Sequence, residues 1–368
     1  MVKELRYSTH SIDESDIAAV IGALRSDWLT QGPQVPRFEQ DLCAYVGAKY
    51  AVAVSSGTAA LHLCMLALRQ SFGPSMVLTS PLSFVASANA ALLDGHEVDF
   101  CDVDRVTGLL DWKRTVSRTE RRFNIVVPVH YAGRACDLGI LQGPIVVEDA
   151  AHALGATCYD GCGKVGNCAH STAACFSFHA VKGITTAEGG AILSNDQGFA
   201  DEVRSLREHG RIDGEMVRLG LNYRLTDIQA ALGRSQLERC DEMREKRCYL
   251  GQCYCSLLHN GVSEDQVFVA GCCDEPCAHA HHLYPVRIKN GKRDAVKAAL
   301  NAQGIKATVH YPCIHLQPYY RDHFGYHDGA FPEAEAWAAE ELSMPLHAGM
   351  VEADVTRVVD ALRKELAA

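Results

Sequence analysis

The sequence predicts an α/β protein in which a large, mostly parallel sheet carries helices on both faces and a smaller α+β domain follows. Between residues 50 and 194, short apolar runs alternate with segments of helical spacing, which is typical of a parallel sheet with covered faces. After a long helical region, a separate group of fewer strands and helices follows. We therefore expect a first domain over residues 1–240, which includes an N-terminal helix, and a second over residues 241–368.

Composition and charge narrow the range of functions. The chain has 368 residues, of which 48% are hydrophobic and 22% charged, as in a globular protein rather than a disordered one. No apolar run reaches the roughly 18 residues of a membrane-spanning helix, and the N-terminus lacks the apolar core of a secretory signal. We expect a soluble cytoplasmic protein that binds no membrane. With 45 acidic and 35 basic residues the net charge is −10, which argues against nucleic acid as a partner.

The order of elements begins with a helix over residues 12 to about 28, for which Ser11 and Glu14 predict a capping box. A second helix is predicted over residues 58–69. Apolar runs predict buried strands over residues 50–54, 76–79, 98–103, 125–129, 145–148, 175–178 and 191–194. Only residues 134–144 join two of these strands. A parallel crossover needs about a dozen residues or more, so we expect an unusually tight connection.

The second half is predicted to open with a long helical region over residues 226–258. In the smaller domain we expect strands over residues 283–288 and 306–311 and helices over residues 293–303 and 352–366.

Lys182 lies in the segment CFSFHAVKGITTAEGG, just after an apolar strand. A lysine that is partly withdrawn from water loses its proton more easily, and the neutral amine can form a Schiff base with a carbonyl group. A simpler interpretation also exists, because most lysines are surface charges. Lys182 is therefore a candidate nucleophile whose role depends on its neighbours.

Asp149 lies at the end of the predicted strand in IVVEDAAHALG. In open α/β sheets, ligands bind beyond the carboxyl ends of the strands. A carboxylate there can keep a pyridine nitrogen protonated, which makes a pyridoxal ring an electron sink. The alternative is that Asp149 caps the helix that follows.

The segment VSSGTAAL at residues 54–61 predicts a strand, a tight turn and the start of a helix. Free backbone N–H groups and the positive end of a helix suit a phosphate there. The glycine-rich P-loop motif G-x-x-x-x-G-K-[ST] does not occur in the chain. Together with Asp149 and Lys182, this turn forms a candidate site for pyridoxal 5′-phosphate (PLP).

Seven blocks occur in order along the chain: SDWLTQGP (26–33), AVAVSSGTAALHL (51–63), TSPLSFVASANA (79–90), PVHYAG (128–133), VEDAAHALGA (147–156), FSFHAVKGITTAEGGAI (176–192) and LNYRLTDIQAALGRSQL (221–237). In this order the sequence resembles the DegT/DnrJ/EryC1/StrS nucleotide-sugar aminotransferases, which are PLP-dependent enzymes of fold type I. HHLYPVRI (281–288) and HYPCIHLQPYY (310–320) are similar to the subgroup that acts in pseudaminic acid biosynthesis.

The resemblance implies a role for each matching residue. Lys182 would be the catalytic residue and hold PLP as a Schiff base, while Asp149 would pair with the pyridine nitrogen. The other implied contacts are His152 beside the ring, Phe84 stacked on it, Gly57, Thr58 and Ser177 at the phosphate, Asn222 at the phosphate from the partner subunit of a homodimer, Thr30 and Gln31 near the substrate from that partner, and Tyr311 in the sugar pocket.

The reaction implied by the resemblance is a ping-pong transfer of the amino group from L-glutamate to C4 of a UDP-4-keto-6-deoxy-N-acetylhexosamine. One alternative is an aminotransferase acting on another nucleotide-linked keto sugar, at C4 or C3. A second is a PLP-binding regulatory protein without turnover, against which the intact Lys182, Asp149 and Asn222 count. Spacing alone does not distinguish the sugars.

The 16 cysteines are scattered, and without an export signal we expect free thiols in a reducing compartment. Two groups offer candidate metal ligands, namely Cys158, Cys162, Cys168 and His170 in one and Cys272, Cys273, Cys277, His279, His281 and His282 in the other. Neither has the paired C-x₂-C spacing of structural zinc sites. We therefore expect no metal site.

Overall fold

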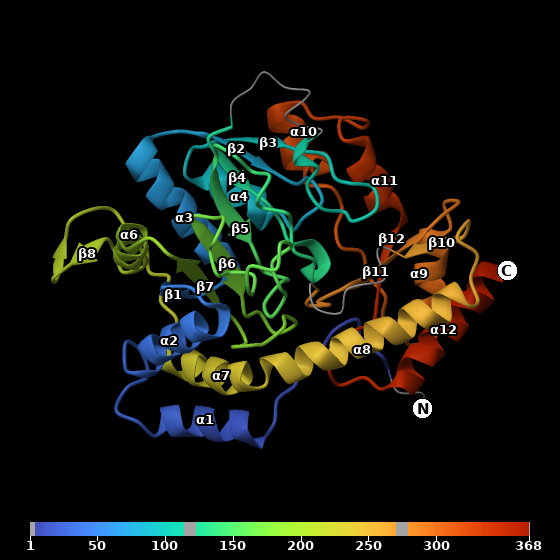
Figure 1. The fold of residues 1–368 in the computed structure, drawn as a ribbon, viewed down its shortest axis with the longest axis horizontal. Helices are drawn as coiled ribbons and strands as arrows, with labels where there is room; N and C mark the ends of the chain where they lie inside the picture. The colour runs from blue at the N-terminus through green and yellow to red at the C-terminus, as the bar shows by residue number, and fades with distance from the viewer. Residues whose placement is uncertain (1–3, 114–122, 270–278, 368) are drawn as a thin grey trace.

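The computed structural model describes residues 4–113, 123–269 and 279–367 (Figure 1). Its larger part is built on the strands β1 (Tyr50–Val54), β2 (Met76–Thr79), β3 (Glu97–Phe100), β4 (Ile125–Val127), β5 (Ile145–Asp149), β6 (Ala173–Ser177) and β7 (Gly190–Ser194). They form one sheet in the order β1-β7-β6-β5-β4-β2-β3. From β3 to β6 each neighbouring pair is parallel, and β7 is antiparallel to both of its neighbours. The predicted α/β class with a mostly parallel sheet is confirmed.

Helices cover both faces of this sheet. Successive side chains of β1 point to opposite faces of the sheet and are buried on both. Val52 and Val54 belong to the apolar cluster on one face, and Ala51 and Ala53 belong to the cluster on the other. The first cluster includes residues of α3 (Gly57–Phe72), α4 (Ala86–Leu93) and α6 (Gln197–Arg207), and the second includes residues of α2 (Gln34–Val46) and α7 (Asp227–Glu238). The N-terminal helix α1 (Glu14–Leu24) lies beside α7 on the side away from the sheet (Figure 1).

The connection from β4 to β5 is as tight as the sequence predicts. Residues 134–144 contain no helix. Leu138, Ile140 and Leu141 instead pack against Val126 and Val146, and this small apolar cluster covers the sheet where a crossover helix would otherwise lie.

The C-terminal part contains an antiparallel sheet of β10 (Val267–Val269), β11 (Tyr284–Ile288) and β12 (Glu341–Met344). Its apolar core includes residues of α8 (Cys240–His259), α9 (Arg293–Ala302) and α12 (Glu352–Ala367). The remaining short elements are β8 (Arg211–Ile212), β9 (Glu215–Met216), α10 (Pro318–Phe324), α11 (Pro332–Glu340) and the 3₁₀ turns η1 (Tyr131–Gly133) and η2 (Ile314–Leu316). The long helix α8 runs from the large part to the small sheet (Figure 1). A domain boundary near residue 240 stays a prediction.

The predicted cap of the first helix is wrong in its residues. Asp13, not Ser11, caps α1, and Asp13 and Asp16 each accept a hydrogen bond from the other's backbone N–H. Asp16 is fully buried, and its Oδ2 lies 2.6 Å from Nη2 of Arg239. This tertiary contact favours a reciprocal cap two residues later than the sequence predicts. The helix also ends at Leu24 rather than near residue 28.

Four other predicted elements differ. The helical region over residues 226–258 is two helices, α7 and α8, which meet at Arg239. The strands predicted over residues 98–103 and 125–129 end early, at Phe100 and Val127. No strand forms over residues 306–311, where Thr308 makes only an isolated bridge.

Side chains explain the missing strand. The backbone N–H of Ala307 donates to Asn301 Oδ1 at 3.1 Å, and that of His310 donates to Glu341 Oε2 at 2.7 Å. Backbone groups that a ladder would pair are satisfied in this way instead.

The cysteines largely match the expectation of free thiols. Cys255 is the exception, because it is disulfide-bonded. The free ones among the described residues are Cys43, Cys64, Cys101, Cys136, Cys158, Cys162, Cys168, Cys175, Cys240, Cys248, Cys253 and Cys313. No helix within the described ranges is both long and apolar enough to cross a membrane.

Candidate active site

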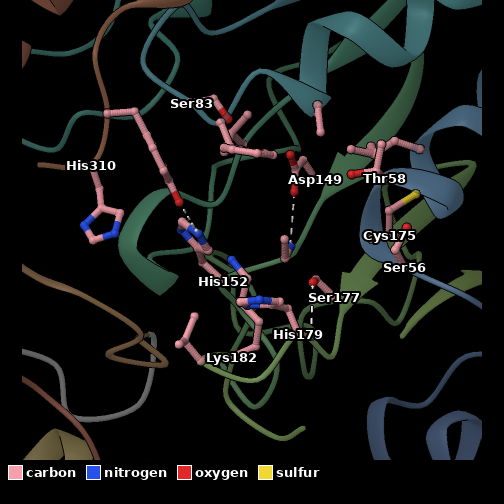
Figure 2. Close-up of a pocket in the computed structure, with 18 of the residues that line it drawn as sticks. Ser56, Thr58, Ser83, Asp149, His152, Cys175, Ser177, His179, Lys182 and His310 are labelled. Carbon is pink, nitrogen blue, oxygen red and sulfur yellow. Dashed lines mark hydrogen bonds between the residues drawn. The ribbon is translucent and has the colours of Figure 1, made fainter. Parts of the chain in front are cut away.

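A cavity of about 440 Å³ lies at the carboxyl edge of the large sheet, bordered by the ends of β5 and β6 and the N-terminus of α3 (Figure 2). The predicted site residues that line it are Gly57, Thr58, Phe84, Asp149, His152, Ser177, Lys182 and Tyr311. The fold therefore brings into one cavity side chains from distant parts of the sequence, as expected for the carboxyl edge of an open α/β sheet.

Lys182 lies in the loop between β6 and β7, held by a 2.8 Å hydrogen bond from its backbone N–H to the carbonyl of His179. Burial lowers the pKa of its amine from 10.5 to about 8, against the opposing effect of the negative charge of Asp149. A substantial fraction of the amine is therefore neutral near pH 8 and able to act as a nucleophile.

Asp149 is the last residue of β5 and is buried. Its Oδ2 accepts a 2.6 Å hydrogen bond from Ser87 Oγ, and its Oδ1 accepts one from the Ala151 N–H at 3.2 Å. Turns rather than a helix follow it, so the alternative interpretation of Asp149 as a helix cap is wrong. The carboxylate is fixed at the wall of the cavity.

The turn between β1 and α3 forms an anion-binding end of the cavity. Ser56 caps α3 by accepting a 3.0 Å hydrogen bond from the Ala59 N–H. The N–H groups of Gly57 and Thr58 lie in the first helical turn, where the helix itself supplies no acceptor. A Cβ atom on Gly57 would lie 2.7 Å from Cβ of Ser177. Glycine therefore allows β6 to approach α3, beside a helix terminus that suits a phosphate.

His152 faces the cavity with one nitrogen bonded and one free of a partner. A 3.1 Å hydrogen bond joins its Nε2 to the Tyr311 hydroxyl. Its buried Nδ1 has no hydrogen-bond partner among the described residues. Burial, reinforced by the charge of Lys182, holds the pKa of His152 well below its usual range. A neutral ring with an unsatisfied nitrogen indicates that a polar ligand atom binds here.

Sequence reasoning missed several residues of this cavity. Those that line it are Tyr7, Ser56, Ser83, His179, Glu188 and His310, and Ser87 lies behind Asp149. Ser83 and Ser87 are one helical turn apart in the block TSPLSFVASANA, and their hydroxyls are 2.8 Å apart. This spacing was a signal that could have found them, whereas nothing in the sequence around Tyr7 marks it.

Three predicted site residues lie outside the cavity of this chain. Gln31 donates a hydrogen bond to the carboxylate of Glu208, and Asn222 forms a backbone bridge with Glu208. Thr30, adjacent to Gln31, forms a bridge with Thr226. The three therefore lie together on one part of the molecule without reaching the cavity.

The donors in the cavity fit PLP. The nucleophilic lysine matches the aldehyde of PLP, and the fixed carboxylate matches its pyridine nitrogen. The helix N-terminus matches its phosphate, and the unsatisfied buried nitrogen matches a polar substituent of its ring. Gly57 keeps the phosphate end of the cavity open, because a Cβ atom at this position would fill the space beside Ser177. The fold and site together define the class as PLP-dependent aminotransferases of fold type I.

Comparison with known proteins identifies the family. The profile of the DegT/DnrJ/EryC1/StrS aminotransferase family matches residues 10–363. The chain belongs to this family and is a PLP-dependent sugar aminotransferase.

Individual relatives agree with this assignment. The spore coat polysaccharide biosynthesis protein SpsC of Bacillus subtilis is 34% identical over 384 residues, covering 98% of this chain and 96% of SpsC. The structure of Helicobacter pylori PseC, an aminotransferase of pseudaminic acid biosynthesis, matches with a TM-score of 0.92 and 30% identity over 99% of this chain and 100% of that one. The PLP form of the putative sugar aminotransferase Spr1654 of Streptococcus pneumoniae matches with a TM-score of 0.89 and 26% identity over 99% of both chains.

Proposed function

We propose that this enzyme transfers the amino group of L-glutamate to C4 of a UDP-4-keto-6-deoxy-N-acetylhexosamine, giving UDP-4-amino-4,6-dideoxy-N-acetyl-β-L-altrosamine for pseudaminic acid synthesis. The observation that carries the proposal is the single cavity shared by Lys182, Asp149 and the N-terminus of α3. The choice of sugar is supported by the similarity to PseC and by the blocks at residues 281–288 and 310–320.

Lys182 has two roles in this proposal. PLP, when bound, supplies an electron sink and carries the amino group between the donor and the acceptor. The Lys182 amine anchors PLP covalently and, once released, accepts the proton from Cα of glutamate and returns one to C4 of the sugar. Its pKa of about 8 suits both tasks, because the amine can hold or give up a proton near neutral pH.

The other residues of the cavity bind and orient. Asp149 holds a proton on the pyridine nitrogen, and the hydrogen bond from Ser87 keeps its carboxylate in place. The residues that would bind the phosphate are Gly57, Thr58 and Ser177, joined by Asn222 of the opposite subunit. His152 would lie beside the 3-hydroxyl of the ring, and Phe84, which is 56% exposed at the cavity wall, would cover its face.

The sugar end of the cavity is formed by Tyr311 and His310. Burial and the charge of Lys182 lower the pKa of His310 to about 4, so its ring is neutral at pH 7. Burial also raises the pKa of the Tyr311 hydroxyl. Neutral hydrogen-bonding groups suit an uncharged keto sugar better than its diphosphate, which we place toward solvent.

A homodimer is part of the proposal. The hairpin β8–β9 projects from the body of the molecule (Figure 1), and the apolar residues Met216, Val217 and Leu219 in and after it are 67%, 53% and 79% exposed. Exposed apolar residues gathered in this way are typical of an interface between subunits. Asn222 comes shortly after these residues in the sequence. A partner subunit that packs on this surface would therefore lie close to Asn222.

We also place the enzyme in the cytoplasm. Apart from the disulfide-bonded Cys255, the described cysteines are free thiols, which persist in a reducing compartment.

The test is a half-reaction followed by a panel of sugars. Addition of L-glutamate to the PLP-loaded protein should remove its visible absorbance band and release 2-oxoglutarate. A protein that stays colourless after PLP is added would contradict the function. The aminated form should then react with the UDP-linked 4-keto sugar faster than with dTDP-linked 4-keto or 3-keto sugars. If one of those reacts faster, the alternative of another nucleotide sugar replaces the proposal.

A further inference from the structure

The loop between β5 and β6 contains a cluster of metal-binding side chains away from the cavity. One ligand atom from each of Cys158, Asp160 and Cys162 lies within 4.8 Å of the others. Cys158 is half-buried, and Asp160 and Cys162 are exposed. We propose that these three side chains bind a zinc ion and that His170 is a positioning residue for Asp160.

The backbone of the loop explains how the sulfur atoms come together. Residues 157–164 form a short hairpin, closed by the bridge between Thr157 and Lys164 and by a 2.8 Å hydrogen bond from the Cys158 N–H to the Gly163 carbonyl. Gly161 and Gly163 have φ values of +74° and +136°, which L side chains rarely adopt. The glycines on either side of Cys162 allow the chain to fold back onto Cys158. A C-x₃-C spacing in a hairpin thus brings the sulfurs as close as a C-x₂-C turn would, which removes the reason to expect no metal site.

The donor set is one that zinc prefers. Two thiolates and a carboxylate, with water as the fourth ligand, form a four-coordinate set that is typical of zinc rather than of calcium or magnesium. A zinc–sulfur bond of about 2.3 Å places two tetrahedral ligands about 3.8 Å apart. The observed cluster is within 4.8 Å, so small side-chain rotations are sufficient to close it around one ion. Each thiol releases its proton to solvent when it binds.

His170 holds the carboxylate in place. Its Nε2 lies 2.7 Å from Oδ2 of Asp160, while Oδ1 of Asp160 accepts a 3.1 Å hydrogen bond from the Cys162 N–H. These two contacts orient both carboxylate oxygens before an ion binds. Hydrogen bonds to the ligands have the same effect at known metal sites. Asn167 adds a hydrogen bond from its Nδ2 to the carbonyl of Cys162 at 3.1 Å.

Cys168, which belongs to the same predicted group, takes no part in the cluster. It is buried, and its Sγ lies 3.3 Å from the carbonyl of Leu193. In the second predicted group, Cys272, Cys273 and Cys277 lie outside the described residues, and His279, His281 and His282 are buried. The inference rests on the hairpin and its contacts with Asn167 and His170, and it is independent of the proposed sugar substrate.

The test is zinc uptake by the reduced, PLP-loaded full chain after treatment with a chelator. Wild type should take up about one more equivalent of zinc per chain than the double variant Cys158→Ser/Cys162→Ser. Substitution of a half-buried cysteine elsewhere, Cys43→Ser, should leave uptake unchanged. The visible band of bound PLP, retained in every variant, shows that the fold is intact.

The role of His170 has its own readout. His170→Ala should weaken zinc binding about 10- to 100-fold, and His170→Gln, which keeps a hydrogen-bond donor, should recover part of the loss. Zinc at about a thousandfold excess over its dissociation constant should raise the Tm of wild type by about 5 °C and leave the double variant unchanged. Equal zinc uptake by wild type and the double variant would overturn the proposal.

Discussion

Ser87 on α4 donates a 2.6 Å hydrogen bond from its Oγ to Oδ2 of Asp149, and both side chains are buried. Ser87 in turn lies 2.8 Å from the hydroxyl of Ser83, which lines the cavity. A hydrogen bond to a buried carboxylate fixes its orientation and is worth more than one between neutral groups. The sheet therefore supplies the carboxylate, while a helix on its face sets the direction in which that carboxylate points.

Replacement of Ser87 tests this relationship. A hydrogen bond to a charged group is worth about 1.5–3 kcal/mol, so Ser87→Ala should lower kcat of the glutamate half-reaction about 10- to 100-fold. Stopped-flow measurement of the visible band gives the rate. Ser205→Ala is the matched control, because Ser205 is buried on α6 and its Oγ has no partner among the described residues. Equal rates in the Ser87 variant and this control would show that Asp149 needs no orientation.

A methyl group at position 57 should close the phosphate end of the cavity. The Cβ of Gly57→Ala would lie 2.7 Å from that of Ser177, so β6 and the start of α3 must separate. We expect PLP affinity to fall at least about tenfold, measured by titration of the apoenzyme, because the helix terminus no longer faces the phosphate. Gly22→Ala in α1, where nothing lies within 4 Å, should keep PLP affinity and raise stability by about 0.5–1 kcal/mol. PLP binding by the Gly57 variant at wild-type affinity would contradict the proposed cradle.

Loss of the Tyr311 hydroxyl should impair the half-reaction with the keto sugar but not the half-reaction with L-glutamate. Tyr311→Phe removes the hydrogen bond to Nε2 of His152 and a polar group from the proposed sugar end of the cavity. We expect KM for the keto sugar to rise about tenfold, equivalent to about 1.4 kcal/mol, while the rate with L-glutamate changes little. Tyr249→Phe on α8, which loses a surface hydrogen bond to Glu352, controls for loss of any tyrosine hydroxyl. An equal loss in both half-reactions would place Tyr311 at PLP rather than at the sugar.

The lowered pKa of Lys182 links stability to pH. Its folded-state pKa of about 8 lies below the usual 10.5, so the buried ammonium destabilises the apoenzyme. This cost is fully present below pH 8 and vanishes as pH rises above 10.5, where the amine is neutral in both states. The inactive apo variant Lys182→Met should therefore have a higher Tm than wild-type apoenzyme at pH 7, and the difference should shrink between pH 8 and 10. Thermal denaturation across that range checks the sign, and a difference that stays constant with pH would contradict it.

Mixed dimers test whether Asn222 acts across the interface. Lys182→Ala should abolish turnover, and Asn222→Ala should lower it by weakening phosphate binding. If Asn222 serves the opposite subunit, a dimer of one chain of each kind has one intact site and one doubly defective site. Random exchange of subunits should then restore up to about a quarter of wild-type activity. Activity that stays at the mean of the two parent variants would show that Asn222 serves the site of its own chain, or that no dimer forms.

Local patterns were sufficient wherever one segment forms a feature by itself. The run YAVAV predicts β1 with its observed bounds, because four buried positions in a row suit a strand with both faces covered. Asp149 and Lys182 were identified because a charged residue directly after an apolar strand lies at the edge of the sheet where ligands bind. The tight link at residues 134–144 followed from its length alone.

Errors arose where a residue outside the local pattern competes with it. Ser11 suits a helix cap, yet Asp13 caps α1, because its partner Asp16 also pairs with Arg239 from the junction of α7 and α8. Residues 306–311 have the composition of a strand, yet the side chains of Asn301 and Glu341 take the hydrogen bonds that the strand would use. Arg239 and Glu341 are distant in sequence from the patterns that they override, and Asn301, six residues before Ala307, belongs to the preceding helix α9.

The sequence by itself determined the class of fold and the PLP chemistry and indicated candidate residues for it, because the hydrophobic period and the residues at strand ends are local properties. Only the tertiary structure decided that the Ser87 hydroxyl holds Asp149 and that Tyr7 and His310 line the cavity. It also decided that Cys158 and Cys162 come together in a hairpin. These contacts depend on how elements pack across the sheet and on the φ angles of two glycines. Neither of these can be read from the spacing of residues along the chain.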